Sequence, residues 1–379
     1  MSSRSSARPT VLLVGLGDLG GVTLELLARE PAVGRIVVGS RNEAAARARC
    51  NLARAGAAAQ GFDPRVEFVR VDLHEIEATA ETIARVAPDL ILCTATMHAW
   101  WLADLLPPEA AAIRRAPFGV WLPVNSVLAR KLMEAVRAAD YRGVVLSAPF
   151  PDVVNVALDR IGLAPTCGVG NVDESATKVQ IVAADRLGAR LDEVRVTLVA
   201  HHALEKFSYD GSADELPPHF LRVEFAGKDV TSELGGDELI RVPYPLPPGR
   251  PKNSFTAGST VRLIRAMLGE DETRLHAPGP GGRPGGYPIL AGRGAVRLAP
   301  IEGLSEAEAI DINERSHRFE GIERIEADGT VLYTDAAAGA IRETIGYDCR
   351  RLAPDDAEPR ARELIRRYAE YARRFGVEA

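Results

Sequence analysis

The stretch Val11–Gly21, VLLVGLGDLGG, places three glycines in GxGxxG spacing directly after an apolar run and before a helix-forming segment. Gly15 permits a tight turn, Gly17 lets a ligand approach the backbone, and Gly20 lets the helix pack closely on the strand. The N-terminus of the helix attracts phosphate groups. The strand before the motif and the helix after it predict a dinucleotide site formed by Gly15, Gly17, Asp18, Leu19 and Gly20.

Four further runs in the first half are apolar on nearly every residue and begin at Arg35, Val66, Leu90 and Gly143. Such runs are typical of strands that are covered on both faces in a parallel sheet. Segments rich in Ala, Leu, Glu and Arg separate them and predict helices. The alternation therefore predicts a doubly wound α/β domain over residues 1–152.

The remaining sequence has a mixed pattern that predicts an α+β domain over residues 153–316 and a C-terminal extension over residues 317–379. The Gly/Pro-dense segment 276–288, HAPGPGGRPGGYP, suggests a linker. Ser305 and Glu308 can form a capping box at the start of a helix. Asp328-Gly329 lies between two alternating runs and predicts a hairpin.

Composition excludes several classes of partner. A formal net charge of -6 over 379 residues gives no basic field for nucleic acid. The sequence shows neither a signal peptide nor a long apolar run, which predicts a cytoplasmic protein with a small-molecule substrate and no membrane partner. The four cysteines are far apart, and no histidines are paired at metal spacing, so neither a disulfide framework nor a metal site is expected.

The second strand ends in VVGSRN, where an acidic residue would bind the ribose hydroxyls of NAD. Instead, Gly39 leaves room for a 2′-phosphate, and the hydroxyl of Ser40 and the guanidinium of Arg41 can bind it. This pattern favours NADP over NAD. The alternative is that Arg41 stacks on adenine or lies in solvent. The expected cofactor site therefore also includes Ser40, Arg41 and Asn42.

The order of motifs in the second half resembles the lactate/malate dehydrogenase family. Ser147–Asp152 (SAPFPD), Gly170–Ala176 (GNVDESA), Leu187-Gly188 and a strand ending at His201-His202 follow one another as in that family, and Gly285–Ser316 is similar to its ending. The resemblance implies a Rossmann domain followed by an α+β substrate domain. It further implies hydride transfer between a nicotinamide cofactor and a ketone or secondary alcohol, and a homodimer or homotetramer.

The resemblance also implies a catalytic pair of histidine and aspartate. Counting from Leu187-Gly188 favours His202, although His201 fits with a one-residue gap. Only one of them can face the cleft, because successive strand residues point to opposite sides. Asp173 matches the aspartate of the family motif. An imidazole can give a proton to the alkoxide at neutral pH, and a carboxylate on its other nitrogen would orient it.

The sequence departs from the family at the substrate. Ala148 replaces the asparagine expected after Ser147, and the arginine that would bind a carboxylate falls on Thr177 or Lys178. Lysine lacks the bidentate fork of arginine, so a substrate larger or less anionic than pyruvate is expected. The expected substrate-binding residues are Lys178 and, from the long loop after LCTAT, Trp100, Arg114 and Arg115. The alternative is that Trp100 and Trp101 pack under the loop. Thr94, Ala95 and Asn125 are expected on the cofactor side.

Other functions remain open from the sequence. Opine-type or saccharopine-type reductases also combine a Rossmann domain with a GSRN-like strand end. Glycosidase relatives of the family use the cofactor together with a metal. The absence of an obvious Cys/His ligand set argues against this glycosidase alternative. The two departures from the family, at the asparagine and the arginine, also fit a non-catalytic NADP-binding regulatory protein.

Overall fold

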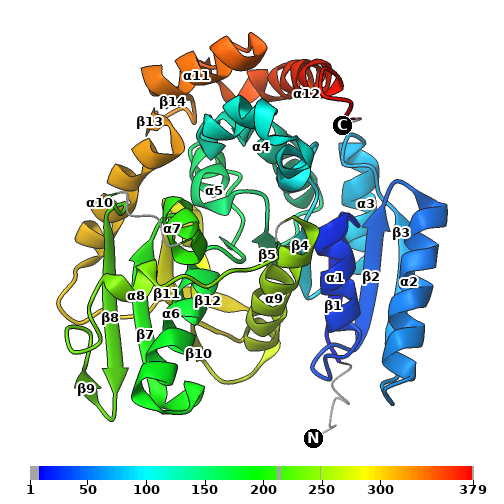
Figure 1. Ribbon diagram of the computed structural model, residues 1–379. Helices are drawn as coiled ribbons and strands as arrows, with labels where there is room; N and C mark the ends of the chain where they lie inside the picture. Colours follow the sequence, from blue (N-terminus) through cyan, green and yellow to red (C-terminus); the bar gives the residue numbers. More distant parts are fainter. Residues whose placement is uncertain (1–7, 211–214, 248, 378–379) are drawn as a thin grey trace, which may run out of the picture.

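The computed structural model describes residues 8–210, 215–247 and 249–377 (Figure 1). Its first half forms a six-stranded parallel sheet in the order β3-β2-β1-β4-β5-β6. The strands are β1 Thr10–Val14, β2 Arg35–Ser40, β3 Arg65–Arg70, β4 Leu90–Cys93, β5 Val144–Ser147 and β6 Cys167–Gly168. The strand order reverses between β1 and β4, and open α/β sheets bind ligands at the carboxyl ends of strands beside such a reversal. The predicted doubly wound domain is confirmed.

Helices cover both faces of this sheet. Leu12 and Val14 of β1 pack in one hydrophobic core with α3 and α4, whereas Val11 and Leu13 pack in another with α1 and α2. A strand that is buried on both faces needs apolar residues throughout, which explains the continuous apolar runs of the sequence. The helices are α1 Asp18–Leu27, α2 Glu43–Ala58, α3 Ile76–Val86, α4 Leu122–Ala138 and α5 Pro151–Asp159.

The second half contains an antiparallel sheet in the order β10-β11-β7-β8-β9, with β12 beside β11. Leu198 of β7 packs with α6 on one face, and the adjacent Val199 packs with Ala309 of α10 on the other. The strands are β7 Val194–Ala200, β8 His219–Phe225, β9 Lys228–Asp229, β10 Thr273–Pro278, β11 Gly286–Gly292 and β12 Ala295–Leu298. The helices include α6 Val172–Leu187, α7 Glu205–Asp210, α8 Glu238–Arg241, α9 Asn253–Leu268 and α10 Glu306–Ser316. This is the predicted α+β domain.

The segment 276–288 is not a linker, as its composition suggested. It forms most of a hairpin, in which β10 and β11 pair from Thr273 opposite Ala291 to Pro278 opposite Gly286. Gly279 has a φ of 59°, in the left-handed region that glycine adopts without a steric penalty, and it begins the reversal between the two strands. Glycine and proline therefore mark a tight connection inside one sheet.

The two halves of the chain share one core. β6 lies beyond the expected boundary at residue 152 and still completes the first sheet. α9, from the second half, packs against α1. Residues of both helices, including Leu24 and Ile264, belong to the same hydrophobic cluster. The two halves of the chain are therefore held together by buried contacts between them.

The C-terminal extension lies over α4 at the top of Figure 1. It consists of the antiparallel sheet β13 Ile322–Ile325, β14 Val331–Tyr333 and β15 Arg351–Leu352, with helices α11 Asp335–Ile345 and α12 Ala357–Arg373. Arg130 of α4 donates to the Pro354 carbonyl at 2.6 Å. The Tyr371 hydroxyl donates to the Ala110 carbonyl at 3.2 Å. The extension is thus anchored to the first domain.

Two local predictions are confirmed. The hydroxyl of Ser305 accepts a hydrogen bond from the Glu308 backbone while the Glu308 side chain accepts one from Ser305, so the capping box forms at the start of α10. β13 and β14 form the hairpin predicted around Asp328-Gly329. Gly329 has a φ of 81°, which the turn requires.

The long loop between β4 and α4 is a packed element. It forms the 3₁₀ helices η1 Trp100–Leu105, η2 Pro108–Arg115 and η3 Phe118–Trp121. Ile113 and Val120 belong to the same core as Tyr368 of α12. The side chain of Trp100 lies outside the described residues, so its expected role in substrate binding stays a prediction. Trp101 is buried, with 7% of its surface exposed.

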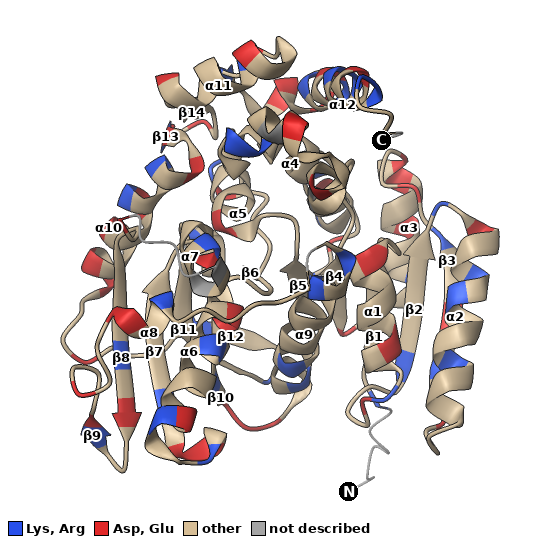
Figure 2. Ribbon diagram, in the orientation of Figure 1, with Lys and Arg blue, Asp and Glu red and all other residues tan. Residues whose placement is uncertain are grey.

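Charges of both signs are interspersed over the fold, as Figure 2 shows. In the part of the chain that the structure describes, no helix is long and apolar enough to cross a membrane. The same described residues contain no group of three or more His, Cys, Asp or Glu side chains arranged to hold a metal ion. All four cysteines are buried and carry free thiols.

Candidate active site

The glycine-rich loop joins β1 to α1 at the point where the strand order reverses. Gly15 has a φ of 99°, and a Cβ there would lie 2.6 Å from the Ala95 nitrogen. A Cβ on Gly20 would lie 2.2 Å from the Gly15 oxygen, which also accepts a 2.7 Å hydrogen bond from the Thr94 hydroxyl. Around Gly17, by contrast, no atom of the described residues lies within 4 Å of such a Cβ. The loop therefore leaves open space at the helix N-terminus.

The end of β2 presents Ser40, Arg41 and Asn42 beside this loop. The side chain of Arg41 is exposed, and Ser40 is partly buried. Asn42 is the N-cap of α2, where its side-chain oxygen accepts a 3.1 Å hydrogen bond from the Ala45 backbone. The oxygen of Asn42 is therefore already used by the helix, whereas Arg41 points to solvent at the strand end.

A cavity of about 530 Å³ runs from the glycine-rich loop into the second half of the chain. At one end it is lined by Gly17, Asp18 and Leu19, and at the other by His202 and residues near it. Between them lie Thr94 and Asn125, whose amide donates to the Trp121 carbonyl at 3.0 Å. The cavity thus connects the predicted cofactor residues with the predicted catalytic histidine. Its wall consists of Gly17, Asp18, Leu19, Thr94, Thr96, Met97, His98, Ala99, Trp101, Phe118, Asn125, Ala148, Pro149, Phe150, Asn171, Glu174, His202, Glu205, Lys206, Tyr209, Lys252, Asn253 and Thr256.

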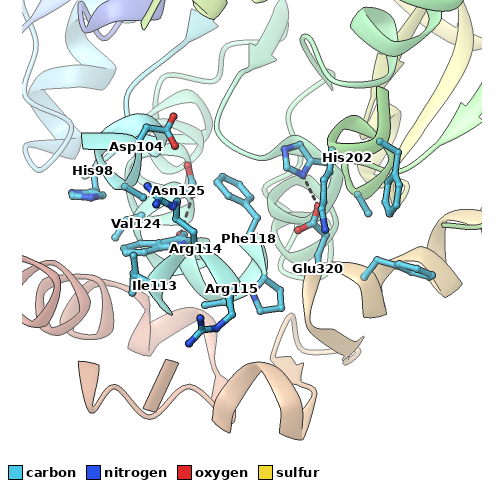
Figure 3. A pocket seen from close by; sticks show the side chains of 18 residues that line it. His98, Asp104, Ile113, Arg114, Arg115, Phe118, Val124, Asn125, His202 and Glu320 are labelled. Atoms are coloured by element: carbon cyan, nitrogen blue, oxygen red, sulfur yellow. Dashed lines mark hydrogen bonds and ion pairs between the residues drawn. The ribbon is translucent and has the colours of Figure 1, made fainter. Parts of the chain in front are cut away.

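His202 is held by carboxylates on several sides. Its Nδ1 lies 2.5 Å from Oε1 of Glu320, its Nε2 lies 3.5 Å from Glu205, and its backbone N–H donates to Asp152 at 2.9 Å. The ring also lies 4.9 Å from the ring of Phe118, centre to centre. Burial opposes the charged imidazolium, but Glu320, Glu205 and Asp152 outweigh it and raise the pKa of His202 to about 9. Figure 3 shows His202 facing Glu320.

His201 lies behind this arrangement and is 2% exposed. Its Nδ1 accepts a 3.3 Å hydrogen bond from the Ala203 backbone, and its ring meets the edge of His317 at 5.0 Å. Burial holds the pKa of His201 well below its usual value. Of the two adjacent histidines, His202 is the one in the wall of the cavity, as expected from the alternation of side chains after a strand.

The structure does not pair Asp173 with His201 or His202. Its carboxylate accepts hydrogen bonds from Ser259 at 2.6 Å and from Arg262 at 2.6 Å, on the side of α6 that faces α9. Successive residues of a helix point about 100° apart, so the adjacent Glu174 faces the cavity instead. The carboxylate on Nδ1 of His202 comes from Glu320 in the C-terminal extension, which the sequence reasoning did not consider.

A second group of polar side chains in the cavity was also missed. Lys252 forms an ion pair with Glu205, and its ammonium lies 4.4 Å from the centre of the Tyr209 ring. The Tyr209 hydroxyl donates to Glu174 at 3.5 Å. Burial, with a smaller contribution from Glu205, raises the pKa of Glu174 to about 8. The signal was present in the sequence, because Glu174 directly follows Asp173 in the segment GNVDESA, which resembles the family motif.

Lys178 is remote from the cavity, so the structure corrects the expected substrate contact. It is fully buried, and its ammonium donates to the carbonyls of Leu239 and Ile240, both at 2.8 Å. Burial lowers the pKa of Lys178 to about 8. Position 178 lies one turn along α6 from Glu174 but is turned toward α8, where the lysine binds two buried carbonyls of a short helix.

Replacing Lys178 with Met is expected to destabilise the fold without impairing the active site. Two buried carbonyls would lose their donor, which costs about 1–3 kcal/mol. The midpoint of urea unfolding should fall, while the affinity for a dinucleotide should stay unchanged. Lys228→Met, at an exposed position, is the matched control. Loss of substrate affinity at unchanged stability would instead support a direct role of Lys178 at the substrate.

A second cavity of about 430 Å³ adjoins the first at His202 (Figure 3). Arg114 and Arg115 line it as expected from the sequence, and Arg114 also donates to the Leu106 carbonyl at 3.0 Å. Phe319 and Glu320 of the extension complete its wall. Trp101 belongs to the first cavity, where its indole N–H donates to Asp18 at 3.0 Å. The long loop therefore contributes to both cavities.

Comparison with known proteins identifies the fold. No protein-family model and no curated protein sequence matches the chain. Among solved structures, lactate dehydrogenase from Eimeria maxima with NADH and oxamate superimposes with a TM-score of 0.56 at 14% identity, over 83% of this chain and 92% of that one. Malate dehydrogenase from Cryptosporidium parvum gives a TM-score of 0.55 at 15% identity, over 82% and 96%. The chain has the lactate/malate dehydrogenase fold, which confirms the resemblance read from the sequence.

Proposed function

We propose that this chain, with its lactate/malate dehydrogenase fold, is an NAD(P)-dependent oxidoreductase that interconverts a ketone and a secondary alcohol. The observation that supports this most is the single cavity that joins the open space over Gly17 to the ring of His202. A dinucleotide site and a proton donor are the two parts that such a reaction needs. The similar solved structures include a lactate dehydrogenase with NADH and oxamate.

The residues of the loop suit a dinucleotide. The free volume over Gly17 at the N-terminus of α1 is where the oxygens of a pyrophosphate would accept hydrogen bonds from backbone N–H groups. Asp18 would repel it, but the Trp101 indole already binds this carboxylate and Arg250 lies 3.7 Å from it. Thr94 and Asn125 would line the nicotinamide end of the cavity. Bound there, the nicotinamide supplies or accepts the hydride.

His202 would act as the general acid in ketone reduction. Its protonated ring gives a proton from Nε2 to the oxygen of the reduced carbonyl, while Glu320 holds Nδ1 and stabilises the cation. Because the pKa of His202 is about 9, the imidazolium prevails at neutral pH. The free protein is therefore prepared for reduction, and oxidation of the alcohol, which needs a neutral imidazole, should become faster as the pH rises toward 9.

Gly17→Val is expected to weaken dinucleotide binding without destabilising the fold. The new side chain would enter open volume, and so would occupy the space of the pyrophosphate. NADPH affinity, measured by fluorescence titration, should fall at least about tenfold, which corresponds to 1.4 kcal/mol. Gly339→Val in α11 is the matched control, since a Cβ there also meets open space. Equal NADPH affinities of Gly17→Val and the wild type would refute the proposed site.

We also propose that NADP is preferred over NAD. The support is the exposed Arg41 next to Ser40 at the end of β2, where the segment VVGSRN has no acidic residue at the position that would bind the ribose hydroxyls of NAD. Arg41→Ala should weaken NADPH binding about tenfold and leave NADH binding unchanged. Arg54→Ala, at an exposed position of α2, controls for the loss of positive charge. Equal affinities of the wild type for the two cofactors would exclude the preference.

The fold is also the basis for proposing that the chain forms a homodimer or homotetramer. Sedimentation equilibrium of the purified protein tests this directly, and a monomer at all concentrations would exclude it.

A further inference from the structure

The second cavity offers space for a part of the substrate that a small 2-oxo acid does not have. Both cavities are lined by His98, Phe118, Asn125, His202 and Lys206, so they meet at the catalytic histidine. The first extends from His202 toward Gly17, and the second extends toward η2 and the C-terminal extension. A molecule whose carbonyl lies at His202 can therefore extend into the second cavity while a dinucleotide occupies the first.

The walls of the second cavity are mainly apolar and partly aromatic. They include Ile113, Ala116, Phe118, Trp121, Val124 and Phe207. His98 stacks on Trp121 with ring centres 5.6 Å apart and an interplanar angle of 10°. Burial lowers the pKa of His98 to about 4, so this imidazole is neutral at neutral pH. Water forms few hydrogen bonds with such walls. An apolar group that enters the cavity lowers its free energy by about 25 cal/mol for each Å² of apolar surface that it buries.

The polar residues of the second cavity give it a positive rim. Arg114, Arg115 and Lys206 are exposed and basic, whereas Asp104 is the one exposed acid among the residues that line this cavity. Glu320 also lines it, but its carboxylate is paired with His202. Arginine binds a carboxylate through a planar fork, which suits an anion at the mouth of an apolar cavity.

From this arrangement we propose that the substrate is a ketone, or the matching secondary alcohol, that carries an apolar group of about the size of a benzene ring and a carboxylate at the far end of that group. The carbonyl lies at His202, the apolar group fills the cavity between Phe118 and Trp121, and the carboxylate meets Arg114 and Arg115. This inference rests on the proposed dehydrogenase function. In the reaction, the carbonyl carbon gains the hydride of the reduced cofactor and the oxygen gains the proton of His202.

The test uses 4-acetylbenzoate, which has the ketone, the ring and the distal carboxylate. Two ketones serve for comparison: acetophenone, which lacks the carboxylate, and pyruvate, which lacks the ring. Reduction is followed by oxidation of NADPH, and binding of the unreactive 4-ethylbenzoate is measured by calorimetry. Ala103 lines the second cavity, and Ala103→Phe reduces its volume. Leu105→Phe is the matched control in the same 3₁₀ helix, because Leu105 is 51% exposed and lies outside the wall of the cavity.

We expect kcat/KM for 4-acetylbenzoate to exceed that for pyruvate at least a hundredfold. Ala103→Phe should weaken 4-ethylbenzoate binding at least tenfold, and Leu105→Phe should not. Arg115→Gln should reduce the preference for 4-acetylbenzoate over acetophenone.

Faster turnover of pyruvate than of 4-acetylbenzoate, with 4-ethylbenzoate binding unaffected by Ala103→Phe, would overturn the proposed substrate class and leave the dehydrogenase function intact. Tight binding of 4-ethylbenzoate without reduction of any ketone would instead remove the dehydrogenase function while the binding site stands.

Discussion

His202→Gln lowers kcat for ketone reduction by about 10²–10⁴-fold, the usual contribution of a general acid, while NADPH binds as tightly as to the wild type. Glutamine keeps a polar side chain of similar reach, but its amide is far too weak an acid to release a proton to an alkoxide. The loss of activity should lie in kcat, because proton donation by His202 stabilises the transition state and not the bound substrate. Steady-state kinetics with a saturating ketone, together with a fluorescence titration of NADPH, measures both quantities.

His201→Gln distinguishes the two adjacent histidines. His201 is buried against His317 and lies outside both cavity walls, so its replacement should lower the melting temperature and leave kcat within a fewfold of the wild type. A large loss of kcat in His201→Gln, with full activity in His202→Gln, would exchange the two roles. Full activity in both variants would remove the acid/base assignment altogether.

Glu320→Gln shifts the pH range of ketone reduction downward. In the wild type, Glu320 is the strongest influence that raises the pKa of His202 to about 9, against the opposing effect of burial. The proton donor is therefore present below about pH 9, and kcat/KM for reduction should fall as the pH rises through that value. Without the Glu320 carboxylate, less charge offsets the effect of burial, although Glu205 and Asp152 remain, so the fall should occur at a lower pH than in the wild type.

The pH profile separates positioning from simple stabilisation. A structural role of Glu320 alone would lower the melting temperature and leave the alkaline limb of kcat/KM near pH 9. Glu320→Asp keeps the charge on a shorter side chain and should restore part of the high-pH activity. If the alkaline limb of the kcat/KM profile of Glu320→Gln stays near pH 9, the positioning role of Glu320 is refuted.

The pair of His202 and Glu320 also affects the stability of the fold. The raised pKa of His202 contributes stability that is complete below about pH 6.5 and is lost as the pH rises through about 9.

Local patterns allowed the sequence to predict the framework of this site. The turn at Gly15–Gly20, the strand runs, the capping box at Ser305 and the turn at Asp328-Gly329 are each determined within a few residues, and all four form as predicted. The glycine-rich hairpin between β10 and β11 was misread, since composition alone does not tell a linker from a tight reversal of two paired strands.

The partners of His202 could not be predicted because they depend on tertiary packing. Asp173 and Glu174 are adjacent carboxylates on one helix, and the packing of α6 against α9 decides which one faces the cavity. Glu320 lies 118 residues from His202 in the sequence, in a segment that has no counterpart in the family motif. The motif arginine fell on Thr177 or Lys178 by position, but the Lys178 side chain turns toward the carbonyls of α8.

The most direct test of the central claim is transfer of deuterium from the 4-position of reduced nicotinamide to a ketone. The purified protein is incubated with 4-deuterated NADPH and, separately, with 4-acetylbenzoate, acetophenone, pyruvate and oxaloacetate, and the products are analysed by mass spectrometry. The account predicts an alcohol that is heavier by one deuterium with the wild type and almost none with His202→Gln. Tight binding of NADPH with no deuterium in any product would contradict it and would indicate a nucleotide-binding protein without hydride-transfer activity.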